Sequence, residues 1–362
     1  MKKLLFVWQD LNHGGGETSL INLINKLNDK YSITVLCLDC INKYQVPESI
    51  NLIFLAEPSN NKIVKIYHKI LFFFKWVNLS RKHDLQIINE AATFSVMAWL
   101  VSILLRKKYF LWEHSCRSEM TSGGGFISRK IYKTALLKAD CIVCVSNYCA
   151  NSLHEYVGNT MYNTKVIHNI LYFQAVSNEK LLLENTINIC AVGRITHEKN
   201  FPLLINALAQ VIPEISKRVH LYICGRKDDE DLITNLIKTL NLQHYVTLTG
   251  HVNNILSYIN QCDIFISSSN SESWSLAVCE ALYCNKAVIA TRTGATEVLE
   301  NGKYGIVVEK RNQEELAKAL TMLINDGSLR ESYAKNSKNA LKRFDQGIAI
   351  DKWCKLIESR IS

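Results

Sequence analysis

The sequence predicts an α/β protein built from two doubly wound domains of the Rossmann type. Short β-branched runs alternate with helical patterns along the whole chain, which is typical of parallel sheets with helices on both faces. The length of 362 residues suits about two domains. The alternation lapses between residues 170 and 186 and then resumes, which predicts a linker there.

The first half holds seven strand candidates, each a short apolar or β-branched run. The first follows two lysines, but its apolar run is shorter than the roughly 7–15 residues of a secretory signal, so a strand is the better interpretation. The expected strands are 4–8, 33–38, 51–55, 85–89, 109–112, 141–146 and 165–168. Helical patterns lie between them at 17–27, 63–81, 94–105, 126–138 and 147–156.

The second half repeats this alternation and ends in helices only. The expected strands are 188–192, 220–224, 246–248, 263–267, 287–290 and 305–308, and the expected helices are 201–212, 229–240, 255–261, 275–283, 295–299, 313–324, 329–343 and 348–361. We expect the last helix to cross back to the first domain. The predicted organisation is a first domain at 1–170, a linker at 171–186, a second domain at 187–345 and a C-terminal helix at 346–362.

Composition excludes some classes of protein and separates the two halves. Apolar residues make up 48% and charged residues 21%, which rules out a disordered or collagen-like chain. The net charge is +9, and it is uneven: residues 1–175 carry 20 basic and 12 acidic side chains, against 22 and 21 in residues 176–362. The first half is therefore expected to face an anionic partner.

The cysteines and apolar runs indicate a cytoplasmic location. Two CxxC pairs, Cys37/Cys40 and Cys141/Cys144, lie in strand-like runs, where residues three apart point to opposite faces. We therefore expect no zinc site, and twelve scattered cysteines without a signal peptide fit a reducing compartment. No apolar run reaches the roughly 18 residues of a spanning helix.

Four motifs that could carry chemistry follow predicted strands, where parallel sheets hold their ligand loops. Two such domains would place a ligand cleft between them.

Gly14-Gly15-Gly16-Glu17 opens a helix after the first strand. It suits phosphate, but a tight turn would use the same glycines, and the third position of a dinucleotide fingerprint is Ser19.

The second domain holds two of these motifs. Gly193-Arg194 and Lys199 follow its first strand, and two cations there suit a diphosphate, although a solvated loop is the alternative. Residues 267–272 form a serine-rich loop ending in Glu272, before a helix that carries Glu280. Free N–H groups at 274–276 could bind phosphate.

The fourth motif, Trp112-Glu113-His114-Ser115, ends a first-domain strand. His114 could hydrogen-bond a sugar hydroxyl, although a lone histidine is more often structural. The acidic run at 228–231 contains an Asp-x-Asp pattern, but acidic residues favour the first turn of a helix, and we expect no metal site.

Residues 58–83 contain no acidic side chain. Their lysines alternate with apolar and aromatic residues, which is typical of an amphipathic helix on an anionic membrane surface. A buried helix with its lysines reaching solvent is the alternative interpretation. Nucleic acid is a poorer fit, because no recognition module accompanies the charge.

These motifs, in this order, resemble family 4 of the retaining glycosyltransferases, which have the GT-B fold. The resemblance covers nearly the whole chain and is densest over 187–310, where Glu272 and Glu280 form the Glu-x7-Glu pattern. Relatives often have Glu-Gly-Phe-Gly where this chain has Glu272-Ser273-Trp274-Ser275, and we expect the loss of both glycines to narrow or reshape the sugar pocket.

The resemblance implies a role for each matching position. His114, Arg194, Lys199 and Glu272 would be catalytic, with the two cations stabilising the leaving diphosphate. The donor would be bound by Gly15, Gly16, Gly193, Arg194, Lys199, Ser273, Trp274, Ser275, Leu276 and Glu280, with Glu280 on the ribose. The acceptor and membrane side would include Lys62, Lys65, Lys69, Lys75 and Trp76.

The function implied is metal-independent, retaining transfer of a hexose or N-acetylhexosamine from a nucleotide sugar, with UDP preferred. The acceptor would be a lipid-linked or surface-polysaccharide intermediate, and the enzyme would sit peripherally on the inner face of the membrane. The alternatives are a GDP-mannose-dependent mannosyltransferase, a sugar-nucleotide 2-epimerase on the same fold, or an inactive binding protein.

Overall fold

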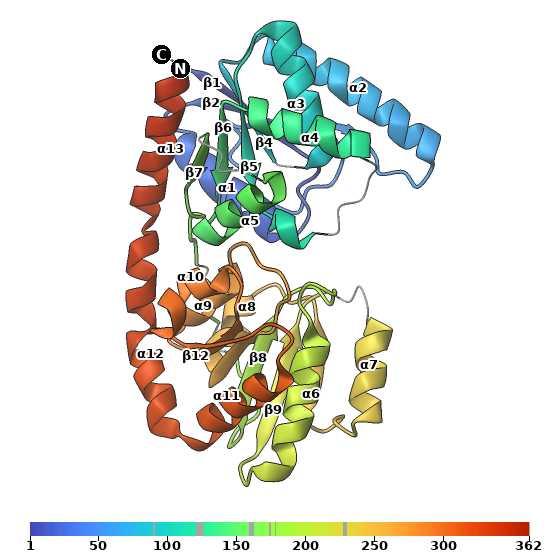
Figure 1. Cartoon of the computed structure of the whole chain (residues 1–362). Coiled ribbons are helices and arrows are strands. Elements are labelled where there is room, and N and C mark those ends of the chain that lie inside the picture. The colour runs from blue at the N-terminus through green and yellow to red at the C-terminus, as the bar shows by residue number, and fades with distance from the viewer. Residues whose placement is uncertain are drawn as a thin grey trace. The chain divides into compact units, whose positions relative to one another are not determined.

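The computed structural model describes residues 1–89, 91–120, 126–158, 163–173, 175–177, 179–226 and 230–361. The chain divides into two compact units, each with its own sheet (Figure 1). The first unit contains Met1–Leu171 and Phe344–Ser362, and the second contains Tyr172–Arg343. Residues 172–186 of the expected linker belong to the second unit, where for example the Ser177 backbone amide donates to Ser257 Oγ at 2.8 Å.

The first unit is built on a parallel seven-stranded sheet in the order β3-β2-β1-β4-β5-β6-β7. The central strand β1 pairs with β2 on one side and β4 on the other, with Leu4 opposite Ile33 and Leu85. Leu4–Trp8 are fully buried, as expected for a strand covered on both faces. The strands are β1 Lys3–Trp8, β2 Ser32–Asp39, β3 Asn51–Ala56, β4 Leu85–Asn89, β5 Tyr109–Glu113, β6 Cys141–Cys144 and β7 Thr164–Val166.

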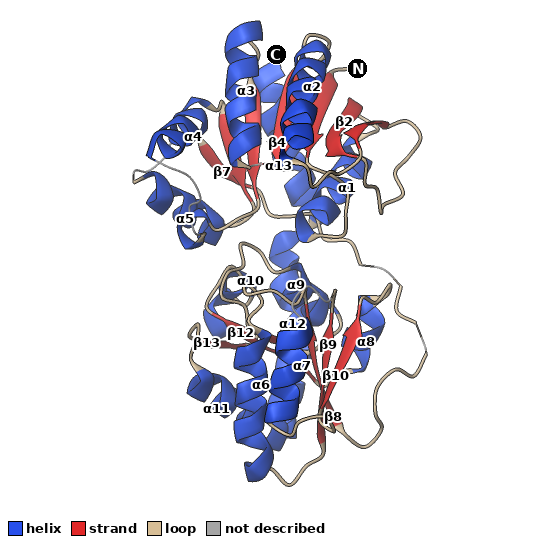
Figure 2. Ribbon diagram, turned by 90° about the vertical axis from the view of Figure 1, so that its right-hand side faces the viewer, coloured by secondary structure: helices blue, strands red, loops and turns tan. Residues whose placement is uncertain are grey.

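Helices cover both faces of this sheet. Figure 2 shows α2, α3 and α4 in front of the strands, whereas α13 lies behind them and packs against α1 and β4. The expected return of the last helix to the first domain is thus confirmed. The helices are α1 Gly15–Leu27, α2 Lys62–Ser80, α3 Ala92–Leu105, α4 Phe126–Lys138, α5 Asn147–Val157 and α13 Gln346–Ile361, with the 3₁₀ turn Arg117–Glu119 after β5.

The second unit has the same doubly wound order, β10-β9-β8-β11-β12-β13, again with every pair parallel. Its strands are β8 Ile187–Val192, β9 Val219–Cys224, β10 Val246–Gly250, β11 Ile264–Ser267, β12 Ala287–Thr291 and β13 Ile306–Val308. Its helices are α6 Phe201–Val211, α7 Glu230–Thr239, α8 Ile255–Gln261, α9 Leu276–Tyr283, α10 Ala295–Val298, α11 Gln313–Asn325 and α12 Gly327–Leu341, with 3₁₀ turns at Ile212–Glu214, Glu300–Gly302 and Lys342–Phe344.

The strand order reverses beside the first strand of each sheet, between β1 and β4 and between β8 and β11. In open parallel sheets, ligands bind outside the carboxyl ends of the strands at this switch point. The loops after β1, β8 and β11 begin at these positions. They contain three of the four motifs singled out from the sequence, and the fourth follows β5, the neighbour of β4.

The sequence predicts neither a membrane-spanning helix nor a metal site. No helix in the described part of the chain combines the length and apolar character required to cross a bilayer. Among the described residues, no group of three or more His, Cys, Asp or Glu side chains is placed to hold a metal ion. Asp228 and Asp229 of the acidic run lie outside the described residues.

Candidate active site

The loop after β8 brings Lys199 back over Gly193. Gly193 has a φ of +152°, and a Cβ at this position would lie 2.9 Å from Lys199 Cδ, so only glycine leaves room for the lysine stem. Gly225, at the end of β9, is equally tight, because its Cβ would lie 1.8 Å from the Gly193 carbonyl oxygen. Two glycines thus fix the path of this loop at the switch point.

The loop after β11 meets the same lysine. Lys199 Nζ lies 2.5 Å from Glu272 Oε2, and the two side chains are 25% and 14% exposed. Ser269 Oγ donates to the same carboxylate oxygen at 3.3 Å. Asn270 links the two loops, because its backbone N–H donates to the Glu198 carbonyl at 2.7 Å. The two loops on either side of the switch point are therefore one hydrogen-bonded unit.

The start of α9 follows this loop directly. Ser275 caps the helix, with its Oγ accepting from the Val278 amide, and the Trp274 side chain beside it is buried. The Gly294 amide holds the preceding turn by donating to the Glu272 carbonyl at 2.7 Å. Glu280 lies one turn further along α9, and burial raises its pKa to about 7.

Arg194 is exposed to solvent, whereas Lys199 and Glu272 are partly buried. No described residue forms an ion pair with it. The pKa of Glu198 is lowered by a hydrogen bond with the Thr196 side chain and also by the charge of Arg194. The second unit thus packs Lys199 over Gly193 and against Glu272, and leaves the Arg194 guanidinium available to an anion.

In the first unit, the glycine loop after β1 lies against His114. A Cβ at Gly16 would lie 3.8 Å from the His114 ring. Gly14 precedes α1 and supplies no side-chain cap, and the Glu17 carboxylate lies beside it, since a Cβ at Gly14 would be 2.2 Å from Glu17 Oε2. Tyr44, which the sequence did not indicate, fixes this loop through a 3.3 Å hydrogen bond from its hydroxyl to the Gly14 carbonyl.

Aromatic rings surround His114. Trp112 and Trp8 lie with ring centroids 4.7 and 5.9 Å from its own, and Trp353 of α13 packs against Trp112 at 5.0 Å. Burial lowers the pKa of His114 to about 3. The imidazole is therefore neutral at physiological pH, which suits a hydrogen bond to a hydroxyl rather than the binding of an anion.

Glu113 and Arg117 form an ion pair next to His114 in the sequence. Arg117 Nε donates to Glu113 Oε2 at 2.7 Å, and the Ser115 amide donates to Glu113 Oε1 at 2.7 Å. The Glu113 side chain is fully buried. Sequence reasoning did not select Arg117, since its only signal is a spacing of four residues from Glu113.

The predicted acceptor and membrane side is only partly on the surface. Lys62, Lys65 and Lys75 are exposed on α2, and Lys69 is partly exposed. Trp76 contradicts the expectation: it is fully buried, and its Nε1 donates to Gln86 Oε1 at 2.6 Å beneath the helix. Trp76 is a core residue that holds α2 against the sheet.

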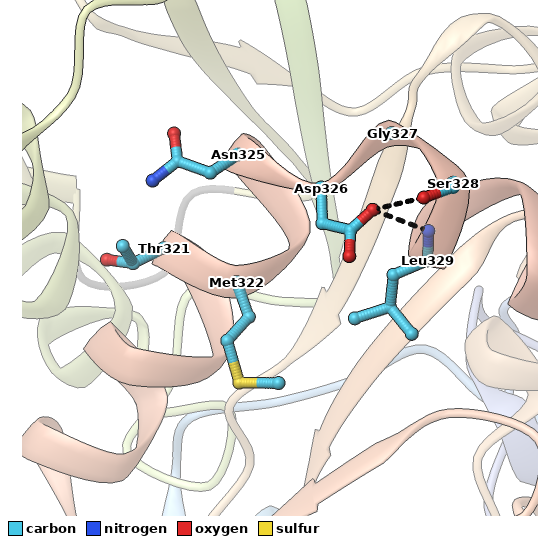
Figure 3. Close-up of a pocket in the computed structure, with 7 residues that line it drawn as sticks. All are labelled: Thr321, Met322, Asn325, Asp326, Gly327, Ser328 and Leu329. Carbon is cyan, nitrogen blue, oxygen red and sulfur yellow. Dashed lines mark hydrogen bonds between the residues drawn. The ribbon is translucent and has the colours of Figure 1, made fainter.

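A hollow of about 650 Å³ lies apart from these motifs, at the junction of α11 and α12 (Figure 3). Asp326 Oδ1 accepts hydrogen bonds there from the Leu329 amide at 2.9 Å and from Ser328 Oγ at 2.6 Å, and so caps α12. This hollow therefore follows from a helix-to-helix turn, and none of the predicted site residues lines it. Its lining residues are Thr321, Met322, Asn325, Asp326, Gly327, Ser328 and Leu329.

Comparison with known proteins covers both units. The family described as Glycosyltransferase Family 4 matches residues 13–171, and the family described as Glycosyl transferases group 1 matches residues 173–340. A relative from Campylobacter jejuni is 26% identical over 362 residues, with 96% of each chain covered. It is the N-acetylgalactosamine-N,N'-diacetylbacillosaminyl-diphospho-undecaprenol 4-alpha-N-acetylgalactosaminyltransferase.

Solved structures share the fold. Anabaena HepE, solved with UDP-glucose, superposes with a TM-score of 0.80 at 20% identity, covering 99% of this chain and 100% of that one. Sucrose-phosphate synthase of Thermosynechococcus elongatus superposes with a TM-score of 0.84 at 17% identity, covering 99% of each chain. Because family matches span both units in this order, the protein belongs to the family 4 glycosyltransferases of the GT-B fold, enzymes that transfer a sugar.

Proposed function

We propose that the protein transfers a hexose or N-acetylhexosamine from a UDP-sugar to a lipid-linked glycan, with retention of configuration. The observation that carries this proposal is the joining of the β8 and β11 loops at the switch point of the second sheet through Lys199 and Glu272. This arrangement puts a cation, a carboxylate and the start of α9 within two adjacent loops. A sugar diphosphate needs these three groups.

The chemistry of each group fits the donor. An ammonium has three N–H donors, and Glu272 takes one from Lys199, so two remain for phosphate oxygens. The described hydrogen bonds of Glu272 all fall on Oε2, which leaves Oε1 to accept from a sugar hydroxyl. Arg194 adds an exposed guanidinium, which can bind phosphate with two N–H groups.

Transfer breaks the bond between the anomeric carbon and the diphosphate, and negative charge then grows on the phosphate oxygens. In this proposal, Lys199, Arg194 and the N–H groups at the start of α9 stabilise that charge as it forms. The acceptor oxygen bonds to the anomeric carbon from the side of the leaving group. Its proton passes to a phosphate oxygen, so the step needs no protein nucleophile and retains the configuration.

We propose that this reaction needs no metal ion. Two cations and a helix N-terminus would supply the positive charge that a divalent ion supplies elsewhere. The acceptor side is assigned to the first unit, where the neutral His114 and the glycine loop can hydrogen-bond hydroxyls. The Campylobacter relative supports a lipid-linked acceptor, since its name describes transfer to a diphospho-undecaprenol-linked saccharide.

A thermal-shift screen of nucleotides and nucleotide sugars in the presence of EDTA tests the donor. We expect UDP and one UDP-sugar to raise the melting temperature, because a ligand that binds only the folded state stabilises it. The Lys199→Ala variant should lose this shift, whereas Lys303→Ala, at an exposed lysine of the same unit, should keep it. A shift with GDP and GDP-mannose alone, or a strict need for Mn²⁺, would overturn the donor or the metal assignment.

The pKa of Glu280 makes a separate prediction about donor affinity. If its carboxylate accepts hydrogen bonds from the ribose hydroxyls, only the charged form binds well, and a pKa of about 7 leaves most of the Glu280 side chains uncharged at pH 6. The affinity for a UDP-sugar should therefore rise about tenfold between pH 6 and pH 8. Titration calorimetry with the UDP-sugar measures this affinity at each pH. The diphosphate of the UDP-sugar does not titrate between pH 6 and pH 8, so a change in affinity reports on the protein.

Glu280→Gln is the matched control for this pH dependence. The amide cannot titrate, so the variant should bind weakly and equally at both pH values. A wild-type affinity that is flat from pH 6 to pH 8, or a slope that survives in Glu280→Gln, would remove Glu280 from the ribose site.

A further inference from the structure

The loops after β8 and β11 are joined by more than one ion pair. Three successive carbonyl groups of the β8 loop accept hydrogen bonds from the β11 loop. The His197 carbonyl accepts from Asn270 Nδ2 at 2.9 Å, and the Glu198 carbonyl accepts from the Asn270 backbone N–H at 2.7 Å. The Lys199 carbonyl accepts from Ser268 Oγ at 2.9 Å. The backbone that carries Lys199 is therefore held by residues outside its own loop.

Asn270 and Asn200 form a side-chain pair beside these bonds. Asn200 Nδ2 donates to Asn270 Oδ1 at 3.0 Å. A carbonyl oxygen can only accept, so the His197 carbonyl fixes the Asn270 amide with its Nδ2 toward that carbonyl and its Oδ1 toward Asn200. Asn270 thus contacts a single neighbouring loop through its backbone N–H and through both ends of its side-chain amide.

Asn200 directly precedes α6 in a conformation that few residues adopt. Its φ of +47° lies in the left-handed region, where asparagine is tolerated better than most residues other than glycine. An asparagine before a helix commonly caps it, but among the described residues the Asn200 side chain makes no cap hydrogen bond to α6. Its amide is turned instead toward the β11 loop, so an asparagine at this position serves the contact between the two loops.

The β11 loop is itself anchored to the sheet. Thr291, at the end of β12, is buried, and its Oγ1 donates to the Ser269 carbonyl at 2.6 Å. A chain of hydrogen bonds therefore runs from β12 through the β11 loop and Asn270 to the backbone of Lys199. Strands fix the position of a site more precisely than loops do, and this chain gives the β8 loop a fixed reference.

Lys199 is thus held at three points along its length. Its carbonyl accepts from Ser268, its stem packs over Gly193, and its Nζ contacts Glu272. The first of these points decides where the stem begins and therefore how far the ammonium reaches. A lysine side chain has many rotamers, so its ammonium stays in one place when the backbone and the stem are both held.

We propose that Asn270, with Asn200 as its partner, is a positioning residue for sugar transfer that acts through Lys199. It holds the β8 loop at the distance from Glu272 at which the Lys199 ammonium can contact the leaving diphosphate and the carboxylate together. This inference rests on the proposed function, because Lys199 must act on the donor for its position to matter. A role in folding alone is the alternative, and its effect on the rate would not depend on Lys199.

Release of UDP from the UDP-sugar identified by the nucleotide screen, with membrane lipid extract as acceptor, tests the proposal. Asn270→Ala should lower kcat/KM about 10–100-fold, since small displacements of a positioning element have effects of this order. In the Lys199→Ala background, the same change should lower kcat/KM by no more than about threefold, because the group that it positions is already absent. A residue that serves the fold alone would give the same factor in both backgrounds.

Asn200→Gly tests the partner. Glycine keeps the left-handed backbone and removes the amide, so kcat/KM should fall severalfold. The double variant Asn200→Gly, Asn270→Ala should be no slower than Asn270→Ala, because both changes remove the same hydrogen bond. A double variant slowed by the product of the two single losses would overturn the assignment of Asn200 as the partner.

Asn188→Ala is the matched control. Asn188 is a buried asparagine at the amino end of β8, away from the ligand edge, and its Nδ2 donates to the Leu183 carbonyl at 2.8 Å. Its replacement should lower the melting temperature and leave kcat/KM near the wild-type value. The proposal is overturned if Asn270→Ala keeps wild-type kcat/KM, if Asn188→Ala loses as much, or if the loss is unchanged in the Lys199→Ala background. A fully active Lys199→Ala variant would overturn the proposed donor site itself, which separates the two failures.

Discussion

Replacing Lys199 with alanine is expected to lower kcat/KM for sugar transfer by about 10²–10³-fold. The lysine lies 2.5 Å from Glu272 at the switch point of the second sheet, so the variant loses a donor to the leaving phosphate and leaves the carboxylate without its partner. Both effects act on the same step. Release of UDP from the donor identified by the nucleotide screen, with membrane lipid extract as acceptor, measures the loss.

A double variant separates the two effects of Lys199. If the lysine served only to balance the charge of Glu272, then Lys199→Ala, Glu272→Gln would remove the unpaired charge and recover much of the activity. If Lys199 contacts the donor phosphates and Glu272 contacts the sugar, the double variant should be at least as slow as Lys199→Ala. Recovery to within a few fold of wild type would refute the catalytic assignment of Lys199, provided that both variants melt as the wild type does.

The strands and helices of this protein could be predicted because each one satisfies its local pattern. Every expected strand is present, since short buried runs between helical patterns have few other interpretations. Differences lie at the ends of elements, where capping decides. α12 begins at Gly327 rather than 329, because Asp326 caps it by accepting from the Leu329 amide. The sequence could not show which strands are neighbours, and therefore not which loops share the switch point.

The site could be predicted only as separate segments. Gly193, Lys199 and Glu272 were each selected, but their contact depends on two loops about 70 residues apart. Tyr44 and Arg117 were missed because their roles arise from contacts that no short motif encodes. Trp76 shows the opposite error, because it was selected for the surface and is a core residue. The sequence does not show where α2 leaves the sheet. Trp76 lies on the half of α2 that packs against the sheet.

Replacing Gly294 with alanine is expected to lower kcat/KM about as strongly as loss of Lys199. A Cβ at Gly294 would lie 2.2 Å from the Ser273 carbonyl oxygen and 2.6 Å from that of Glu272. Both obstacles are backbone, so the turn that carries Glu272 must move. A displacement near 1 Å at a positioning element can cost about 100-fold in rate. We also expect a loss of about 1–3 kcal/mol in the free energy of unfolding, as for other overpacked sites.

Gly327→Ala is the matched control, because its Cβ would meet only the Arg330 side chain at 3.5 Å and would sit on the first residue of α12. Alanine favours a helix more than glycine does, so this variant should keep full activity and unchanged or slightly higher stability. The two variants add the same methyl group to the same unit. If Gly294→Ala kept wild-type kcat/KM, as Gly327→Ala should, transfer would not depend on the position of Glu272. The proposed role of Glu272 in the donor site would then be wrong.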